Sequence, residues 1–190
     1  MKKLIFLPLI FGLVFIAGCA SERQSKDWLE LNQATNYPMP ECPESDRSVT
    51  STETDLPAMP LPCLGHDAFV NLAGLPTGKP LIVSLWASWC VICEDDAPAF
   101  IAAKNKFQNL NLIGINYQDK ESAAIASATK WRLPFASVVD ADTSLQSFYQ
   151  ISGLPVTLIY DEKGKLLARI NGPIGTPEEF LNYLDSVLNN

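Results

Sequence analysis

Short apolar runs alternate with amphipathic stretches from about residue 56 onward, which is the pattern of an α/β domain. The run 81–86 is almost continuously apolar, as expected of a central strand buried on both faces. Thr176 is a predicted helix N-cap, because Pro177 follows at the first helical position and two glutamates complete the first turn. The pattern predicts strands at 68–72, 81–86, 110–117, 135–139, 156–160 and 166–170, and helices at 90–107, 120–131, 144–149 and from 177 onward.

The N-terminus is typical of a secretory signal peptide, because Lys2 and Lys3 precede an apolar run at 4–18. A permanent transmembrane helix needs about 20 apolar residues, so this shorter run favours a cleaved signal. The ending Ile16-Ala17-Gly18-Cys19 resembles the lipobox of bacterial lipoproteins. The resemblance implies that Cys19 becomes a lipid-carrying mature N-terminus; the alternative is an ordinary signal peptide in which Cys19 is incidental.

The sequence between the signal and the domain is rich in Ser, Thr, Glu, Asn and Pro, with a small apolar island at Trp28. Such composition predicts a mostly flexible tether. We therefore divide the chain into a signal peptide at 1–18, a lipid-anchored tether at 19–54 and one folded domain at 55–190.

The charge of the chain is acidic, with 21 Asp and Glu against 14 Lys and Arg and a formal net charge of −7. No basic cluster lies beyond the extreme N-terminus, so nucleic acid is not an expected partner.

The stretch Trp86-Ala87-Ser88-Trp89-Cys90-Val91-Ile92-Cys93 lies where a predicted buried strand ends and a helix begins. Two intervening residues at a helix start place the sulfurs of Cys90 and Cys93 close enough to bond. The unpaired N–H groups and partial positive charge of a helix N-terminus favour a thiolate at the first cysteine. We expect Cys90 to be the exposed nucleophile and Cys93 to resolve the mixed disulfide.

The surroundings of this pair resemble the extracytoplasmic TlpA, ResA and CcmG group of thioredoxin-like proteins. The matching features are Trp-Ala-Ser-Trp-Cys, Pro98 five residues after Cys93, the strand end at 114–119, and Gly153-Leu154-Pro155-Val156-Thr157. The resemblance implies a thioredoxin fold, with a central mixed β-sheet flanked by helices and an N-terminal β-hairpin extension. It also implies that Pro98 kinks the helix.

The Gly-Leu-Pro loop resembles the cis-proline loop that faces the redox pair in this family. The resemblance implies a cis bond before Pro155, with Leu154 and Trp89 contacting a substrate segment that binds by β-strand addition. The alternative is an ordinary trans proline that opens a strand.

Two positions depart from the family. Ser84 stands where thioredoxins carry a buried Asp. Asp96 is the candidate replacement, because it lies three residues after Cys93 on the same helical face and resembles the active-site Glu of the ResA-like pattern. The alternative for Asp96 is a plain acidic residue in a first helical turn. Val156 replaces the acidic residue that CcmG-type proteins carry after the cis-proline, which weakens a direct transfer of their cytochrome role.

The residues next to the pair favour a reducing couple. Val91 and Ile92 carry no charge, and acidic side chains at 94–96 oppose the helix field, so the Cys90 thiolate should be only weakly stabilised. Cys42 and Cys63 remain once the other cysteines are assigned, and in an oxidising compartment two leftover thiols most simply pair with each other. Free or intermolecular thiols are the alternatives.

These features predict a thiol-disulfide oxidoreductase on the extracytoplasmic side of a bacterial membrane, with no cofactor and no metal. Its partners would be protein thiols and disulfides of the envelope and an unidentified redox partner; cytochrome c maturation is one such role. One alternative is a metallochaperone that binds copper or zinc, because Cys63 and His66 together with Cys90 and Cys93 supply four plausible ligands. Another is a non-catalytic interaction protein that keeps the fold.

Overall fold

The computed structural model describes residues 37–50 and 53–189. The predicted signal peptide, Cys19 and the first part of the predicted tether lie outside the described residues. Within the described ranges, no helix is both long enough and apolar enough to cross a bilayer.

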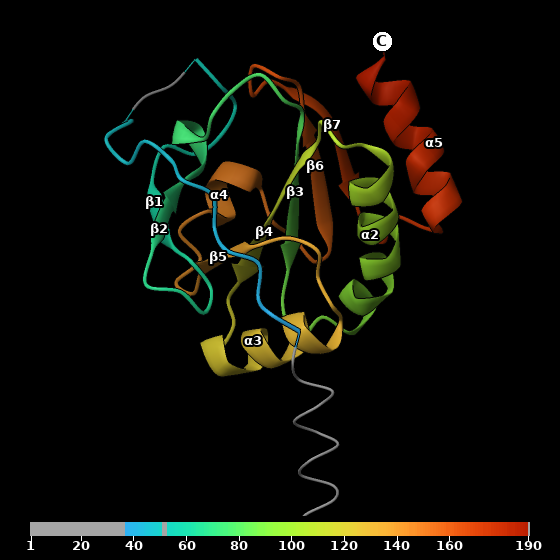
Figure 1. Ribbon diagram of the computed structural model, residues 1–190. Coiled ribbons are helices and arrows are strands. Elements are labelled where there is room, and N and C mark those ends of the chain that lie inside the picture. The colour runs from blue at the N-terminus through green and yellow to red at the C-terminus, as the bar shows by residue number, and fades with distance from the viewer. Residues whose placement is uncertain (1–36, 51–52, 190) are drawn as a thin grey trace, which may run out of the picture. The chain divides into compact units, whose positions relative to one another are not determined.

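A mixed sheet of five strands in the order β5-β4-β3-β6-β7 forms the centre of the domain (Figure 1). β3 pairs with β4, and β4 with β5, in parallel, whereas β3 with β6 and β6 with β7 are antiparallel. The predicted thioredoxin-like arrangement is confirmed. The strand bounds are β3 Leu81–Trp86, β4 Asn111–Tyr117, β5 Ser137–Asp140, β6 Val156–Tyr160 and β7 Leu166–Asn171.

The sheet separates two hydrophobic clusters, because successive side chains of a strand point to opposite faces. Ile82 and Trp86 of β3 pack with helices α2 (Ala97–Lys106) and α5 (Pro177–Leu188), which lie together over one face (Figure 1). Val83 and Leu85 pack toward the hairpin formed by β1 (Pro60–Pro62) and β2 (Phe69–Asn71), the short 3₁₀ helix η1 (Leu72–Gly74) and helix α4 (Gln146–Tyr149). Every residue of β3 is buried, which explains its continuous apolar run.

The helix predicted at 90–107 is divided into two parts. A 3₁₀ helix, η2, covers Val91–Asp96, and the α-helix α2 begins only at Ala97. The Glu94 carbonyl accepts a hydrogen bond from the Ala97 N–H, since Pro98 has no N–H to donate from the next position. Pro98 therefore lies in the first turn of α2 and does not kink a continuous helix.

Helix α5 begins as the sequence predicts. The Thr176 hydroxyl accepts from the Glu179 N–H, and the Glu179 carboxylate accepts from the Thr176 N–H at 2.8 Å. This capping box satisfies two N–H groups that would otherwise lack partners. Helix α3 (Glu121–Lys130) follows β4 at the end of the sheet where β3 also finishes (Figure 1).

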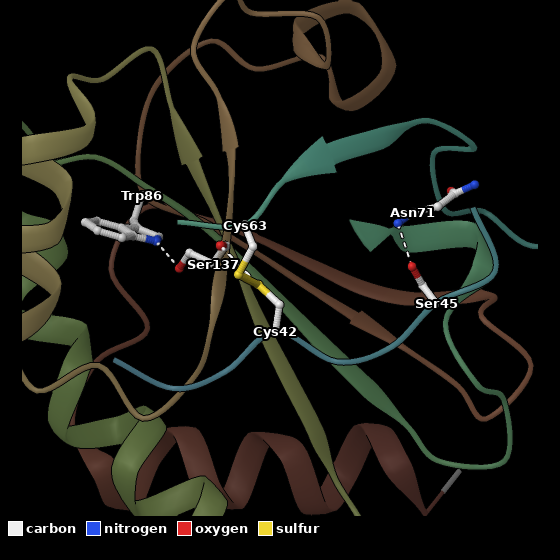
Figure 2. The surroundings of a disulfide bond; sticks show 6 residues. All are labelled: Cys42, Ser45, Cys63, Asn71, Trp86 and Ser137. Atoms are coloured by element: carbon white, nitrogen blue, oxygen red, sulfur yellow. Dashed lines mark hydrogen bonds between the residues drawn. A yellow bond between two sulfur atoms is a disulfide. The ribbon is translucent and has the colours of Figure 1, made fainter. Parts of the chain in front are cut away.

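Residues 37–50, which we call the strap, lie against the domain although their composition is that of a tether. The Tyr37 hydroxyl donates to the Leu133 carbonyl at 3.1 Å. Figure 2 shows the Asn71 N–H donating to the Ser45 hydroxyl at 2.9 Å. The strap is held by isolated polar contacts and by a disulfide from Cys42. Such contacts leave no hydrophobic periodicity in the sequence, so composition alone does not reveal them.

Candidate active site

Cys90 and Cys93 form a disulfide at the start of η2, with Cα atoms 5.4 Å apart and an S–S distance of 2.04 Å. Cys90 is the N-cap of η2. Its N–H donates to the Ala87 carbonyl, and the Cys93 N–H donates to the Cys90 carbonyl, both at 3.1 Å. The structure therefore holds the oxidised form of the pair, in a turn that directly follows β3.

The two cysteines are almost equally buried in this form, at 5% exposure for Cys90 and 4% for Cys93. The expected contrast between an exposed and a buried cysteine is absent from the oxidised form, in which both residues belong to the same packed cluster. Their neighbours are exposed instead: Trp89 at 54%, Val91 at 82% and Ile92 at 44%. An apolar rim therefore surrounds the pair, as expected at a surface that contacts protein chains.

Asp96 is buried at 2% exposure at the end of η2. Residues three apart in a 3₁₀ helix lie above one another, so Asp96 and Cys93 share one buried side of η2. One oxygen, Oδ1, accepts from the Ile174 N–H at 3.0 Å, while Oδ2 is buried without a hydrogen-bond partner among the described residues. Burial raises the pKa of Asp96 to about 6, helped by the nearby Asp95 charge and opposed by the Ile174 hydrogen bond.

The peptide bond between Leu154 and Pro155 is cis. β6 begins directly after Pro155, and its first residue, Val156, pairs with Leu85 near the end of β3. The proline loop therefore lies at the same end of the sheet as the redox pair. Leu154 is half-buried and contacts both hydrophobic clusters.

No carboxylate stands on β3 beneath the pair. Ser84 occupies that position at 3% exposure, and its antiparallel partner in the register is Thr157 on β6, which is completely buried. Asp96 and Asp140 are the fully buried carboxylates of the described residues, and Asp140 instead accepts hydrogen bonds from backbone N–H groups in the loop after β5. Asp96 is thus the buried acid next to the cysteines.

A second disulfide joins Cys42 of the strap to Cys63, with an S–S distance of 2.00 Å and Cα atoms 6.2 Å apart (Figure 2). The Cys42 sulfur lies 3.6 Å from the Ser137 carbonyl oxygen, and the Ser137 hydroxyl accepts from the Trp86 indole N–H at 3.0 Å. Trp86 in turn packs in the same cluster as the redox cysteines. The second disulfide therefore fixes the strap beside the layer that supports the active site.

This disulfide removes a ligand from the metal-binding alternative, since the Cys63 sulfur is bonded to Cys42. Among residues 37–50 and 53–189, no group of three or more His, Cys, Asp or Glu side chains could hold a metal ion.

Two supporting contacts were not predicted from the sequence. Ser137 binds the Trp86 indole, and Asp119 accepts hydrogen bonds from the backbone and hydroxyl of Ser88. The sequence at 114–119 indicates only a resemblance to the strand end of the family. The available signal was Asp119, a polar residue just after a buried strand, but its partner Ser88 lies 31 positions away along the chain.

A cysteine pair at a helix start, on a mixed five-stranded sheet and beside a cis-proline loop, defines a thioredoxin-like protein. Residues 53–169 match the AhpC/TSA family, and the chain belongs to this family.

Several relatives are named for thiol-disulfide chemistry. The chain is 26% identical over 188 residues to the thiol:disulfide interchange protein HelX of Rhodobacter capsulatus, covering 98% of this chain and 96% of the relative. It is 31% identical over 119 residues to the thiol:disulfide interchange protein DsbE of Pseudomonas fluorescens biotype C, covering 62% and 65%. Over 112 residues it is 26% identical to the thiol-disulfide oxidoreductase ResA of Bacillus cereus, covering 58% and 64%.

Solved structures share the fold. A secreted Mycobacterium tuberculosis disulfide oxidoreductase homologous to E. coli DsbE aligns with a TM-score of 0.59 and 22% identity, covering 67% of this chain and 95% of that one. Together with the bonded cysteine pair, the relatives identify the chain as a thioredoxin-like thiol-disulfide oxidoreductase of the DsbE and ResA type.

Proposed function

We propose that this oxidoreductase is anchored by a lipid on the extracytoplasmic side of a bacterial membrane and that it reduces disulfides of other envelope proteins. The observation that carries the proposal is the Cys90–Cys93 pair at the start of η2, edged by exposed apolar side chains at 89, 91 and 92. A protein substrate can dock on such a rim, whereas the packed cluster beneath it excludes water from the sulfurs.

The exchange proceeds in two steps from the reduced pair. The Cys90 thiolate attacks one sulfur of the substrate disulfide, which forms a mixed disulfide and expels the other substrate sulfur as a thiolate. The Cys93 thiolate then attacks the Cys90 sulfur, restores the internal disulfide and releases the second substrate thiolate. Two electrons pass to the substrate, and the protons lost by Cys90 and Cys93 balance those taken up by the two substrate thiolates.

The charges around η2 favour the reducing direction. Glu94 lies in the first turn, Asp95 is exposed next to it, and η2 carries no basic residue in its last turn. Lys130 donates to Glu94 at 3.1 Å, so the charge of this lysine is engaged by a carboxylate of η2. A thiolate in this field is weakly stabilised, which makes the reduced form a ready electron donor. A reduction potential close to that of the strongest periplasmic oxidants, around −120 mV, would contradict this direction.

The substrate class that we propose is a Cys-x-x-Cys disulfide in an extended segment, such as the haem-attachment motif Cys-x-x-Cys-His of an unfolded cytochrome c. Support comes from the proline loop beside the pair, where β-strand addition would place the segment next to Cys90. Val156 puts no charge after the proline and is itself buried, so recognition there would rest on the backbone of the loop.

Trapping tests the exchange and its partner together. The Cys93→Ser variant should accumulate a mixed disulfide on Cys90 with a Cys-x-x-Cys-His peptide and with the natural partner in membranes. Cys90→Ser is the matched control, because it keeps one thiol but removes the attacking one. Equal trapping by both variants would show that Cys90 is not the nucleophile.

The lipid anchor rests on the pattern that ends at Cys19. Cys19→Ser should release the protein from the membrane fraction or leave its signal uncleaved, and mass spectrometry of the wild-type protein should find a diacylglyceryl group on the mature N-terminus. An unmodified Cys19 in membrane-bound protein would refute the anchor.

A further inference from the structure

The turn that carries Cys90 is fastened to the loop after β4 by one carboxylate. Asp119 Oδ2 accepts from the Ser88 N–H at 2.5 Å, and Asp119 Oδ1 accepts from the Ser88 hydroxyl at 2.7 Å. The same two oxygens accept from the side-chain amide of Asn116 at 2.9 Å and from the Lys120 N–H at 2.7 Å. Asp119 thus joins the turn before the redox pair to the end of the neighbouring strand.

The residue before Asp119 holds the next position of the same turn. The Trp89 indole N–H donates to the Gln118 carbonyl at 2.9 Å. Gln118 has a φ of 49°, in the left-handed region that residues other than glycine seldom occupy, and its own N–H donates to the Asp140 carbonyl at 2.9 Å. Gln118 and Asp119 therefore hold both Trp89 and Ser88, the two residues that precede Cys90.

Asn116 shows that this arrangement is kept at some cost in stability. Its side chain is completely buried and directs its amide nitrogen at Asp119, while its own Oδ1 is buried without a partner among the described residues. A buried acceptor without a partner is destabilising. The contact with Asp119 is therefore better explained by what it does for the active-site turn than by its contribution to stability.

The carboxylate stays charged whenever thiol exchange takes place. Partial burial acts to raise the pKa of Asp119, but the hydrogen bonds from Ser88, Asn116 and Lys120 together outweigh it and hold the pKa below the ordinary value. The contact with Ser88 therefore persists across the pH range in which cysteines react.

We propose that Asp119 is a positioning residue for disulfide exchange. It holds the Ser88–Trp89 turn, so that the Trp89 ring keeps a fixed position beside Cys90 and an incoming protein chain can pack against it. The inference rests on the proposed function, since it concerns the same exchange. Trp89 is 54% exposed, and a side chain so exposed would sample several rotamers if its indole were not held. Ordering the Trp89 ring in advance lowers the entropy that is lost when a protein chain binds beside Cys90.

The test compares Asp119→Ala with Asp46→Ala. Asp46 is a matched control because it also accepts from a serine N–H, at 2.9 Å, and from the same serine hydroxyl, at 2.6 Å, but it does so on the strap. Each protein is assayed for exchange with a Cys-x-x-Cys-His peptide disulfide, for exchange with the small molecule hydroxyethyl disulfide, and for hydrogen exchange of the Trp89 indole N–H by NMR.

The expected result for Asp119→Ala is a fall of about 10- to 100-fold in the rate constant for the peptide. Exchange with hydroxyethyl disulfide should change less than about 3-fold, since a small disulfide does not need to pack against the Trp89 ring. The indole N–H should lose its protection from hydrogen exchange. Asp46→Ala should stay within about 2-fold of the wild type in both reactions and keep the indole protected.

The proposal is overturned if Asp119→Ala matches Asp46→Ala with the peptide, or if both disulfides slow equally, which would indicate a general loss of structure. Should Asp119→Ala fail to fold, Ser88→Ala removes one of the two bonds and should still slow the peptide selectively. A wild-type protein that reacts with hydroxyethyl disulfide but not with the peptide would refute the proposed substrate class, whereas unchanged indole protection in Asp119→Ala would refute the positioning role alone.

Discussion

Replacing Asp96 by Asn should remove a distinct pH dependence from the stability of the oxidised protein. Asp96 is 2% exposed, and its pKa is raised from 3.8 to about 6, chiefly by burial. Asn has the same shape and still offers an oxygen to the Ile174 N–H, which Asp96 binds at 3.0 Å. The variant therefore changes the ionisation and little else.

The sign and size of the effect follow from proton linkage. Because the folded state binds the Asp96 proton more tightly than the unfolded state, this contribution to stability is fully present below pH 3.8 and is lost as the pH rises through about 6. The difference between the folded and the unfolded pKa of Asp96 corresponds to a change of about 3 kcal/mol in the free energy of unfolding, at about 1.4 kcal/mol per pH unit. At low pH the protonated acid buries one O–H donor and the amide buries two N–H donors, so we expect the Asn variant to be no more stable than the wild type there and to be the more stable protein near neutral pH.

Denaturant unfolding of both oxidised proteins between about pH 4 and pH 8 measures this difference. The quantity to plot is the free energy of unfolding of the variant minus that of the wild type, because it cancels all other titrating groups. Asp95→Asn is the control: the Asp95 charge is a smaller cause of the raised pKa, so its removal should move the transition slightly down in pH without abolishing it. A difference that stays constant across this pH range would refute the reasoning.

Two further changes test the layer next to the active site. Replacing Cys42 and Cys63 by Ala should lower the free energy of unfolding by about 3 kcal/mol in a denaturant titration, because the 21-residue separation is no longer closed, while the reduction potential of the active pair stays unchanged. Gly114→Ala should lower the melting temperature clearly, since the added Cβ would lie 2.2 Å from the Ser137 hydroxyl. Gly153→Ala, whose added Cβ meets nothing within 4 Å, should melt like the wild type; equal melting of the two variants would contradict the packing described around Gly114.

The sheet was predictable because its signal is local. A strand buried on both faces, such as Leu81–Trp86, must be apolar at every position, and such a run is visible without any knowledge of its partners. The start of α5 was predictable for the same reason, since its capping box lies within four consecutive residues. The helix predicted at 90–107 was wrong in its first turns, because Val91–Asp96 form a 3₁₀ helix and α2 begins only at Ala97, a change in hydrogen bonding that hydrophobic periodicity does not reveal.

The rest of the site depends on contacts between distant segments. The partner of Asp96 comes from Ile174, 78 positions along the chain, and the strap contact of Tyr37 lies 96 positions away. An Asp or a Tyr does not reveal from its type which distant residue it contacts. The sequence therefore identified Asp96 by its spacing from Cys93 but not by the burial that raises its pKa. The strap was assigned to a tether because polar, proline-rich segments that are held by a disulfide and single hydrogen bonds have the composition of flexible ones.

The exchange includes a proton transfer in which the buried acid Asp96 can act on the redox pair. Cys93 must lose a proton before it attacks the mixed disulfide, and a residue that is 4% exposed in the oxidised form lies where little water is available to receive that proton. Asp96 lies one 3₁₀ turn along η2 on the same buried side, and its Oδ2 has no hydrogen-bond partner among the described residues. With a pKa of about 6 the carboxyl is mostly ionised at neutral pH yet close enough to that pH to be protonated, which is the condition for a group that accepts a proton and later returns it. We therefore expect Asp96 on η2 to accept the proton of Cys93, because Ser84 on β3 has no carboxylate.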